Sequence, residues 1–343
     1  MRVLVTGHNG YIGSVMSSLL KSVGHEVVGL DSFFFADCTL EPDSEPVPAF
    51  RKDVRDITVA DLQGFEAIVH LAALCNDPLG DLHPEWTHEI NHAASVHLAR
   101  MARDAGVGRY LYASSCSMYG ASGGDDTLSE EAPLRPLTPY AVSKVRTEED
   151  VSKLADSSFS PVFLRNATAY GVSPRLRADV VLNNLVCWAH TTGQIRLNSD
   201  GSAWRPIVHV QDIARSFAAA LAAPRETIHN QAFNVGVNGE NYQVHELAEI
   251  VRNTVAGCTV EFMGTAGPDP RSYRVDFSKL VRAFPALKPQ WNAAFGAKDL
   301  FAALQEAQVT LEDFQGRKYL RLAQIKYLLD RGALDSTLRW VRQ

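Results

Sequence analysis

Short apolar runs alternate with longer amphipathic stretches along the first half of the chain. Compact apolar runs occupy residues 3–6, 27–30, 68–71, 110–113, 162–164 and 232–235. Their length and near-continuous hydrophobicity are typical of strands that are buried on both faces of a sheet. Between them, residues 12–23 and 91–105 place apolar positions at helical spacing. This alternation predicts βαβ crossovers, and therefore an α/β fold with a Rossmann-type, doubly wound parallel sheet.

The second half of the chain is less regular. Proline and glycine interrupt residues 170–177, 198–206 and 264–270, a composition that is typical of loops. We expect these loops to reach over a binding site. From residue 301 onward the pattern is helical and charged, and its leucine and tyrosine positions predict packing onto the body of the protein.

Composition narrows the class of protein. The 343 residues are 46% hydrophobic, which is enough for a large core and a smaller appended domain. A net charge of -6 argues against a protein that binds nucleic acid by general electrostatics. The five cysteines are scattered without paired spacing, and the histidines form no metal-binding pattern, so we expect reduced thiols and no metal. With neither a signal peptide nor an apolar stretch long enough for a membrane, we expect a cytoplasmic protein.

A glycine-rich turn follows the first predicted strand directly. Gly7, Gly10 and Gly13 stand where a backbone must turn tightly, approach a pyrophosphate and point a helix N-terminus at it. Asp31 ends the second strand, where a carboxylate can accept hydrogen bonds from both hydroxyls of an adenosine ribose. The same carboxylate would repel a 2′-phosphate, so the pattern predicts NAD rather than NADP. In the alternative interpretation the turn only connects two elements and Asp31 only caps the next segment.

A second group of polar residues suits proton transfer. Tyr140 and Lys144 are four residues apart, on one face of a helix that begins after Pro139. The unperturbed pKa of tyrosine is about 10, and a neighbouring ammonium would favour the phenolate. Ser114 and Ser115 follow the strand at 110–113, at the strand end where open α/β sheets bind ligands.

These motifs, in this order, resemble the extended short-chain dehydrogenase/reductase family, which includes nucleotide-sugar epimerases and dehydratases such as UDP-galactose 4-epimerase. The GxxGxxG spacing of the turn, followed by SSxSxYG and YxxxK, carries the resemblance. It implies that Tyr140 is the general acid/base, that Lys144 tunes it and holds the nicotinamide ribose, and that Ser115 binds the reacting sugar oxygen. The resemblance implies cofactor contacts at Gly7, Gly10, Tyr11, Ile12, Gly13, Asp31, Asp53, Val54, Leu71, Ala72, Ala73, Asn91, Ser114, Tyr140 and Lys144. Asn91 corresponds to an asparagine that braces the central strands and helices of the family.

The resemblance also implies a set of substrate contacts and a homodimer. The candidate substrate-binding residues are Asn76, Ser117, Thr168, Asn184, Arg205 and Arg271. The two arginines suit a diphosphate because each offers a planar fork of donors, although ordinary surface charge is the alternative. Asn76 equally fits a simple Asn-Asp-Pro turn.

Some positions depart from the family pattern. Family dehydratases carry an Asp-Glu pair after the active-site hydroxyl residue, where this chain has Cys116 and Ser117. The missing acids disfavour 4,6-dehydration. The catalytic cysteine of GDP-sugar 3,5-epimerases lines up with Ser117, so we interpret Cys116 as a packed thiol. Thr168 stands where the family has asparagine, and Pro206 follows Arg205 where the family has aspartate.

The sequence therefore predicts an NAD-dependent epimerase that acts on the sugar of a nucleoside-diphosphate sugar. In this hypothesis the sugar passes through a transient ketone, at C4, with Tyr140 taking the hydroxyl proton. One alternative is a nucleotide-sugar 4-ketoreductase or dehydrogenase, and another is a non-catalytic NAD-binding sensor. We expect residues 1–165 to form mainly the NAD-binding domain and residues 166–343 mainly the substrate-binding domain, with a segment at about 205–240 returning to the first.

Overall fold

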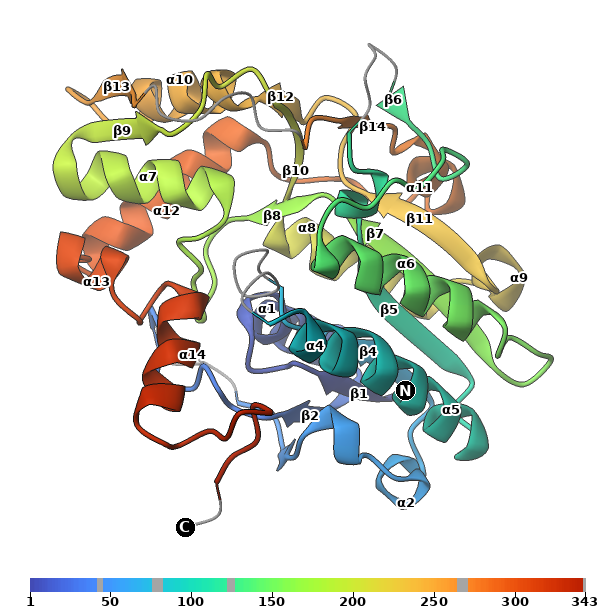
Figure 1. Cartoon of the computed structure of the whole chain (residues 1–343). Helices are drawn as coiled ribbons and strands as arrows, with labels where there is room; N and C mark the ends of the chain where they lie inside the picture. Colours follow the sequence, from blue (N-terminus) through green and yellow to red (C-terminus); the bar gives the residue numbers. More distant parts are fainter. Residues whose placement is uncertain (42–45, 76–82, 122–126, 264–270, 342–343) are drawn as a thin grey trace.

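A parallel sheet of seven strands organises the molecule in the computed structural model, which describes residues 1–41, 46–75, 83–121, 127–263 and 271–341 (Figure 1). In sheet order the strands are β11 (Gln231–Val235), β7 (Ser160–Asn166), β5 (Arg109–Ser115), β4 (Ala67–His70), β1 (Arg2–Thr6), β2 (Glu26–Asp31) and β3 (Ala49–Arg51). All six neighbouring pairs are parallel. The six apolar runs predicted as strands all lie in this sheet, and the predicted Rossmann-type fold class is confirmed.

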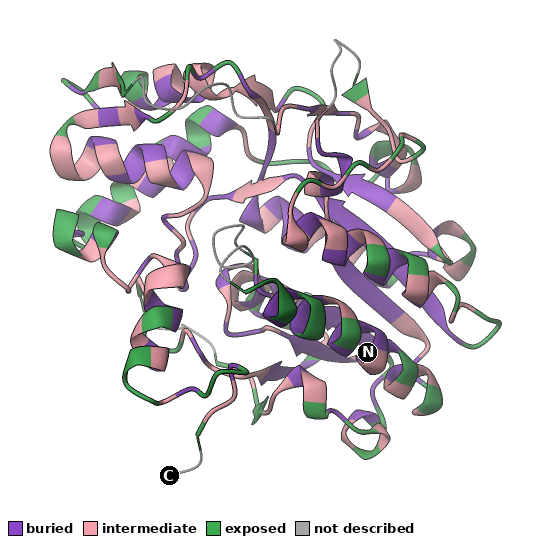
Figure 2. Ribbon diagram, viewed as in Figure 1, coloured by how far each residue is buried: buried purple, intermediate pink, exposed green. Residues whose placement is uncertain are grey.

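Alternate side chains of the central strand enter two different cores. Val3 and Val5 pack with helices α1 (Tyr11–Ser22) and α8 (Val210–Ala222). Leu4 packs on the other face with α2 (Val59–Leu62), α5 (Ala94–Asp104) and α6 (Pro139–Ser152). All three side chains are fully buried, because strand side chains alternate between faces and helices cover both. Much of the central sheet is accordingly coloured as buried in Figure 2.

The predicted helix at 91–105 begins differently from the prediction. The α-helix α5 starts at Ala94 and is preceded by α4 (Pro84–Thr87) and a π-helical turn, η2 (His88–Ala93). The hydroxyl of Ser95 donates to the carbonyl of Asn91 at 2.6 Å, and the hydroxyl of Thr147 donates to the same carbonyl at 3.1 Å. Side-chain donors thus satisfy a carbonyl in the distorted turn, a feature that periodicity does not reveal.

The remaining elements form a second lobe and several connections. The second lobe contains helices that share one apolar core: α7 (Val181–Thr192), α10 (Val244–Thr254), α12 (Ala293–Glu306) and α13 (Leu311–Gln315). Small sheets consist of β12 (Asn241–Gln243), β10 (Trp204–His209) and β8 (Thr168–Tyr170), of β13 (Thr259–Phe262) and β9 (Gln194–Leu197), and of β14 (Arg274–Val275) and β6 (Thr127–Leu128). The other short helices are η1 (Val54–Asp56), η3 (Cys116–Tyr119), α9 (Arg225–Ile228) and α11 (Ser278–Ala283). The domain boundaries at 165 and 205–240 stay a prediction.

The last part of the chain returns to the first domain. Helix α14 (Arg321–Asp330) and the segment that follows it lie near β2 in Figure 1. An apolar cluster joins them to the loops after β2 and β4 and to the π-helical turn, through Phe34, Leu74, Ile90, Ile325 and Leu338. The packing that we predicted for the charged tail is therefore confirmed. Within the described ranges, every helix is too short or too polar to cross a membrane.

Candidate active site

A cavity of about 320 Å³ opens at the carboxyl ends of β1, β4 and β5. The strand register brings these ends together, because Thr6 pairs with Leu30 on one side and with His70 on the other. Of the predicted cofactor contacts, the cavity wall includes Gly7, Gly10, Tyr11, Ile12, Gly13, Asp31, Asp53, Val54, Leu71, Ala72, Ala73, Ser114, Tyr140 and Lys144. Ser115, Ser117 and Thr168 also line it. One cavity thus joins the glycine turn to the proton-transfer residues.

The glycine turn leaves room that side chains would fill. A Cβ on Gly13 would lie 2.0 Å from the carbonyl oxygen of Gly7, and Gly7 itself has a positive φ of 72°. Gly10 is the N-cap of α1 and offers no side-chain cap to the N–H groups of the first helical turn. A bare helix N-terminus that lines a cavity fits the diphosphate of a dinucleotide.

Asp31 is held rigidly at the end of β2. One carboxylate oxygen accepts the N–H of Asn9 at 3.0 Å, and the other accepts the N–H of Phe33 at 2.7 Å. Burial raises the pKa of Asp31, and these two hydrogen bonds act against that rise by favouring the carboxylate. The fixed carboxylate fits the adenosine ribose of NAD.

Tyr140 and Lys144 lie on the first turns of α6. Thr138 caps this helix by accepting the N–H of Ala141 at 3.2 Å. Pro139 is its first residue, so the helix is the predicted one and starts one residue earlier than predicted. Lys144 is 2% exposed, and its Nζ donates to the carbonyl of Ala113 at 2.7 Å. This Nζ lies 5.4 Å from the ring centre of Tyr140.

The charge balance around Tyr140 suits a tunable phenol. Burial raises the pKa of Tyr140 above its usual range, whereas the ammonium of Lys144 acts to lower it. For Lys144, burial acts to lower the pKa, but the attraction of the ammonium to the ionisable groups of Tyr112, Tyr140 and Cys75 outweighs burial and raises the pKa. The lysine is therefore charged at neutral pH, and any further positive charge in the cavity would bring Tyr140 closer to its working range.

Hydroxyl and amide groups face the cavity beside this pair. The Oγ of Ser115 accepts the N–H of Ser117 at 3.1 Å, and Ser115 pairs with Asn166 across β5 and β7. The Oγ of Ser117 and the Oδ1 of Asn166 are buried and have no hydrogen-bond partner in the part of the chain that the structure describes. Both residues line the cavity, so both can serve a polar ligand. Asn166 was not among the predicted site residues, although it stands two positions before Thr168, which was.

Cys116 points away from this chemistry. It is fully buried, and its thiol donates to the carbonyl of Arg165 at 3.1 Å. Burial raises the pKa of the thiol well above its usual range, so a thiolate is disfavoured. These features agree with the packed thiol that the sequence predicted, and all five cysteines are free.

Four predicted site residues lie away from the described cavity wall, and a fifth cannot be placed. Asn91 is fully buried and exchanges two hydrogen bonds with Leu74, so in the structure it braces the loop after β4. The amide of Asn184 donates to the carbonyl of Ala178 at 2.9 Å. Arg205 lies on β10 and donates to the carbonyl of Trp204, and Arg271 precedes β14. Asn76 falls outside the described residues. The assigned roles of all five stay predictions.

The cavity also contains residues that sequence reasoning missed. Arg177 donates to the carbonyl of Cys75 at 2.9 Å and forms an ion pair with Asp179 at 2.8 Å. Arg321, the first residue of α14, lines the wall together with Phe35. Arg177 lies in a loop that the sequence placed over a site, but nothing local to Arg321 indicates a contact with the first domain.

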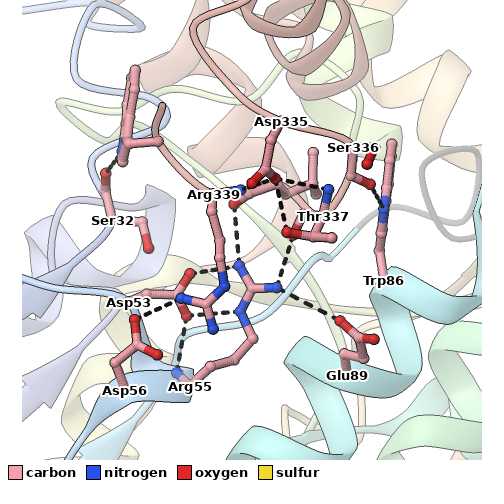
Figure 3. A network of polar contacts seen from close by, with 12 residues as sticks. Ser32, Asp53, Arg55, Asp56, Trp86, Glu89, Asp335, Ser336, Thr337 and Arg339 are labelled. Atoms are coloured by element: carbon pink, nitrogen blue, oxygen red, sulfur yellow. Dashed lines mark hydrogen bonds and ion pairs between the residues drawn. The ribbon is translucent and has the colours of Figure 1, made fainter. Parts of the chain in front are cut away.

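Polar contacts fix the C-terminal segment at this end of the cavity (Figure 3). Arg55 donates to both carboxylate oxygens of Asp53 and to the carbonyls of Thr337 and Leu338. The indole N–H of Trp86 donates to the carbonyl of Ser336 at 2.8 Å. A further indole N–H, that of Trp340, donates to the carbonyl of Ser32, which itself lines the cavity. The segment thereby borders the cavity at the side of Asp31 and Asp53.

Known proteins resemble this chain in sequence and in structure. The family model "NAD dependent epimerase/dehydratase family" matches residues 3–236. A UDP-glucose 4-epimerase of Mycolicibacterium smegmatis is 33% identical over 309 residues, which cover 86% of this chain and 96% of that protein.

Two solved structures add to this likeness. The UDP-glucose 4-epimerase of Thermus thermophilus in complex with NAD has a TM-score of 0.76 and 26% identity, covering 89% of this chain and 99% of the other. The dTDP-glucose 4,6-dehydratase DesIV of Streptomyces venezuelae, with NAD bound, has the same TM-score and identity and covers 89% and 97%. The chain therefore belongs to the NAD dependent epimerase/dehydratase family, and it is an enzyme whose cofactor is NAD.

Proposed function

We propose that this enzyme inverts the configuration at C4 of the sugar in a nucleoside-diphosphate sugar. The relatives named as UDP-glucose 4-epimerases support both the position and a uridine nucleotide. Bound NAD would supply the acceptor for a hydride from the sugar carbon and would return that hydride to the opposite face of the sugar ring. The cofactor would therefore be regenerated in every cycle.

Three residues of the chain would manage the proton. Tyr140 would accept the proton of the sugar hydroxyl as the ketone forms and would give it back when the alcohol re-forms. Lys144, held by the carbonyl of Ala113, would keep the phenol in its working range. Ser115 would donate a hydrogen bond to the reacting oxygen, with Ser117 beside it. At the far end of the substrate, Arg205 and Arg271 would bind the diphosphate.

The acid–base content of the cavity wall favours epimerisation over dehydration. Among the described residues that line the cavity, the carboxylates are Asp31 and Asp53. Both would lie where the adenosine of NAD binds, at the end of the cavity that we call the adenosine end. Eliminating water from a keto sugar requires a proton donor beside the leaving hydroxyl. Near Tyr140 the corresponding positions hold the buried thiol of Cys116 and the hydroxyl of Ser117. This observation carries the proposal against the dehydratase chemistry that also occurs in the family.

The test is a reaction with nucleotide sugars at catalytic amounts of NAD. Purified enzyme is incubated with UDP-, dTDP-, GDP-, CDP- and ADP-sugars, products are followed by NMR, and NADH absorbance is recorded alongside. We expect a product of unchanged mass, inverted at C4, without net NADH. Loss of water from the product would support a dehydratase instead. Stoichiometric turnover of the cofactor would support the ketoreductase or dehydrogenase.

A further inference from the structure

Arg321 is a buried cation with an unused donor. Its side chain lines the cavity, and the residue is only 5% exposed. Its Nη2 donates to the carbonyl of Arg175 at 2.7 Å, but its Nη1 is buried and has no hydrogen-bond partner among the described residues. A buried guanidinium with an unpaired donor is unfavourable, so such a group in a binding cavity indicates a missing acceptor.

The surroundings of Arg321 connect it to the glycine turn. Arg175, whose carbonyl it holds, donates from its own Nε to the side-chain oxygen of Asn9 at 3.2 Å. Asn9 lies in the turn and donates its N–H to Asp31. On the opposite side, the guanidinium carbon of Arg321 lies 4.7 Å from the ring centre of Phe35, in the loop after β2. Arg321 therefore stands between the turn and the loop that border the adenosine end.

Three arginines, Arg175, Arg177 and Arg321, lie close enough to influence one another. Burial lowers the pKa of Arg321, and Arg177 and Arg175 act in the same direction, whereas Cys38 and Asp179 act to raise it. This pKa is lowered to about 10, so the guanidinium still carries its charge at neutral pH. Asp179 pairs with Arg177, and no carboxylate of the described residues lies within ion-pair distance of Arg321. An anion that entered here would remove the cost of the buried charge.

We propose that Arg321 is a cofactor-binding residue that contacts the diphosphate of NAD. The N-terminus of α1 would bind the diphosphate on one side, and the guanidinium fork would bind it from the side of α14. The family model matches residues 3–236, so Arg321 belongs to a part of the chain beyond that match. The apolar cluster of Phe34, Ile325 and Leu338, together with the contacts of Arg55 in Figure 3, would hold Arg321 in place.

The substrate also carries a diphosphate, but the position of Arg321 favours contact with the diphosphate of NAD. The residues around Arg321 belong to the glycine turn and to the loop after β2, which also hold Asp31. The proposed substrate arginines, Arg205 and Arg271, lie outside the described cavity wall. Binding assays can separate the two sources, because ADP carries the phosphates of one ligand and UDP those of the other.

The experiment measures the affinity of nucleotide-free protein for NAD, ADP, UDP and adenosine. Calorimetry serves for the charged ligands, and ligand-observed NMR serves for adenosine. The variants are Arg321→Met, which removes the charge but keeps an apolar stem, and Arg321→Lys, which keeps the charge without the fork. Arg331→Gln is the matched control, because Arg331 directly follows the same helix, is exposed, and uses its side chain to contact Tyr327 in its own segment.

We expect Arg321→Met to weaken the affinity for NAD and ADP at least about tenfold, and to leave the affinity for adenosine and UDP within about twofold of the wild type. Arg321→Lys should fall between Arg321→Met and the wild type, and Arg331→Gln should bind as the wild type does. The melting temperature of nucleotide-free Arg321→Met should equal or exceed that of the wild type, because an uncompensated buried charge is gone.

Three results would overturn the assignment. Unchanged affinity for NAD would mean that Arg321 does not contact the cofactor. Equal losses for adenosine and ADP would mean that the residue only shapes the pocket. A loss for UDP with ADP unaffected would assign Arg321 to the substrate diphosphate. Because binding is measured rather than turnover, none of these results depends on the proposed epimerase reaction.

Discussion

The two ends of the cavity are assembled from different parts of the sequence. At the catalytic end, Ser115, Tyr140 and Lys144 come from β5 and α6, which are adjacent elements of one sheet domain. At the adenosine end, the glycine turn from the start of the chain meets Arg321 and the segment around Trp340 from its last part. The first end is a local motif, whereas the second exists only once the whole chain has folded.

This difference separates chemistry from cofactor retention. Proton transfer requires a few groups at fixed distances, and one helix supplies two of them at i and i+4. Retention of a dinucleotide requires a surface that closes around it. In our proposal the C-terminal segment would provide it, since apolar packing and hydrogen bonds hold this segment beside the cavity. Removing only the phenol oxygen of Tyr140 should change turnover at nearly constant NAD affinity, and substitutions at the second end should do the reverse.

Tyr140→Phe gives the largest expected effect and breaks the catalytic end alone. Without the phenol, the sugar hydroxyl loses its proton acceptor, and turnover should fall about 10³–10⁴-fold. NMR of the product over time measures the rate, and calorimetry should show NAD affinity within about threefold of the wild type, which is within about 1 kcal/mol. Tyr327→Phe, on α14 outside the cavity wall, is the control and should keep the wild-type rate. A fully active Tyr140→Phe would exclude the proposed acid/base.

Lys144→Met should lower turnover at neutral pH about 10²-fold. The ammonium acts to lower the pKa of Tyr140, so its removal raises that pKa further. At a given pH less phenolate then forms, and the rise of kcat/KM with pH should move to higher pH in the variant. A pH profile of both proteins measures the shift, and it also distinguishes tuning from packing, because a packing defect would lower the whole profile without moving it.

Much of the fold could be predicted from the sequence because the signals are local. Strands such as β1 and β5 contain continuous apolar runs. Such runs predict strands in the middle of a sheet, because helices that cover both faces bury the side chains on both sides. The start of α6 could be predicted from Pro139, and the glycine turn from the spacing of Gly7, Gly10 and Gly13. For the same reason Ser115, Tyr140 and Lys144 were predicted, whereas Asn166, which lies beside them in the cavity wall, was not.

What escaped prediction depends on distant contacts. The short strand β3 is exposed and joins the sheet only by pairing with β2, so periodicity gave no sign of it. The π-helical turn depends on Ser95 and Thr147, which bind the carbonyl of Asn91 from two helices. Arg321 is one arginine among several in a charged tail, and its place in the cavity follows from the packing of α14 against the loop after β2.

Arg55→Gln is expected to loosen the adenosine end. The side chains of Arg55 and Asp53 are 9% and 15% exposed and lie 2.6 Å apart, and Arg55 also holds the carbonyls of Thr337 and Leu338. Losing these charge-assisted hydrogen bonds should cost about 1.5–3 kcal/mol of unfolding free energy. Urea unfolding measures that loss. NAD should dissociate several-fold faster in a stopped-flow assay, with the chemical step unchanged in the NAD-loaded enzyme. A slower chemical step at full NAD occupancy would contradict the separation of the two ends.

Arg339→Gln is expected to have the smallest effect, and it sharpens the comparison of the two ends. Arg339 pairs with Asp56 at 2.6 Å, in the same network as Arg55, but the two side chains are 39% and 50% exposed (Figure 3). Exposed ion pairs contribute only about 0.2–1 kcal/mol, so unfolding and NAD release should barely change. Because Arg339 holds the pKa of Asp56 below its usual range, the contribution is present at neutral pH and is lost as the pH falls through that lowered pKa. The variant and the wild type should therefore become equally stable in acid and in high salt. If Arg339→Gln instead destabilised the protein as much as Arg55→Gln, the segment would be held by its total charge, and the buried contacts of Arg55 could not be what fixes it.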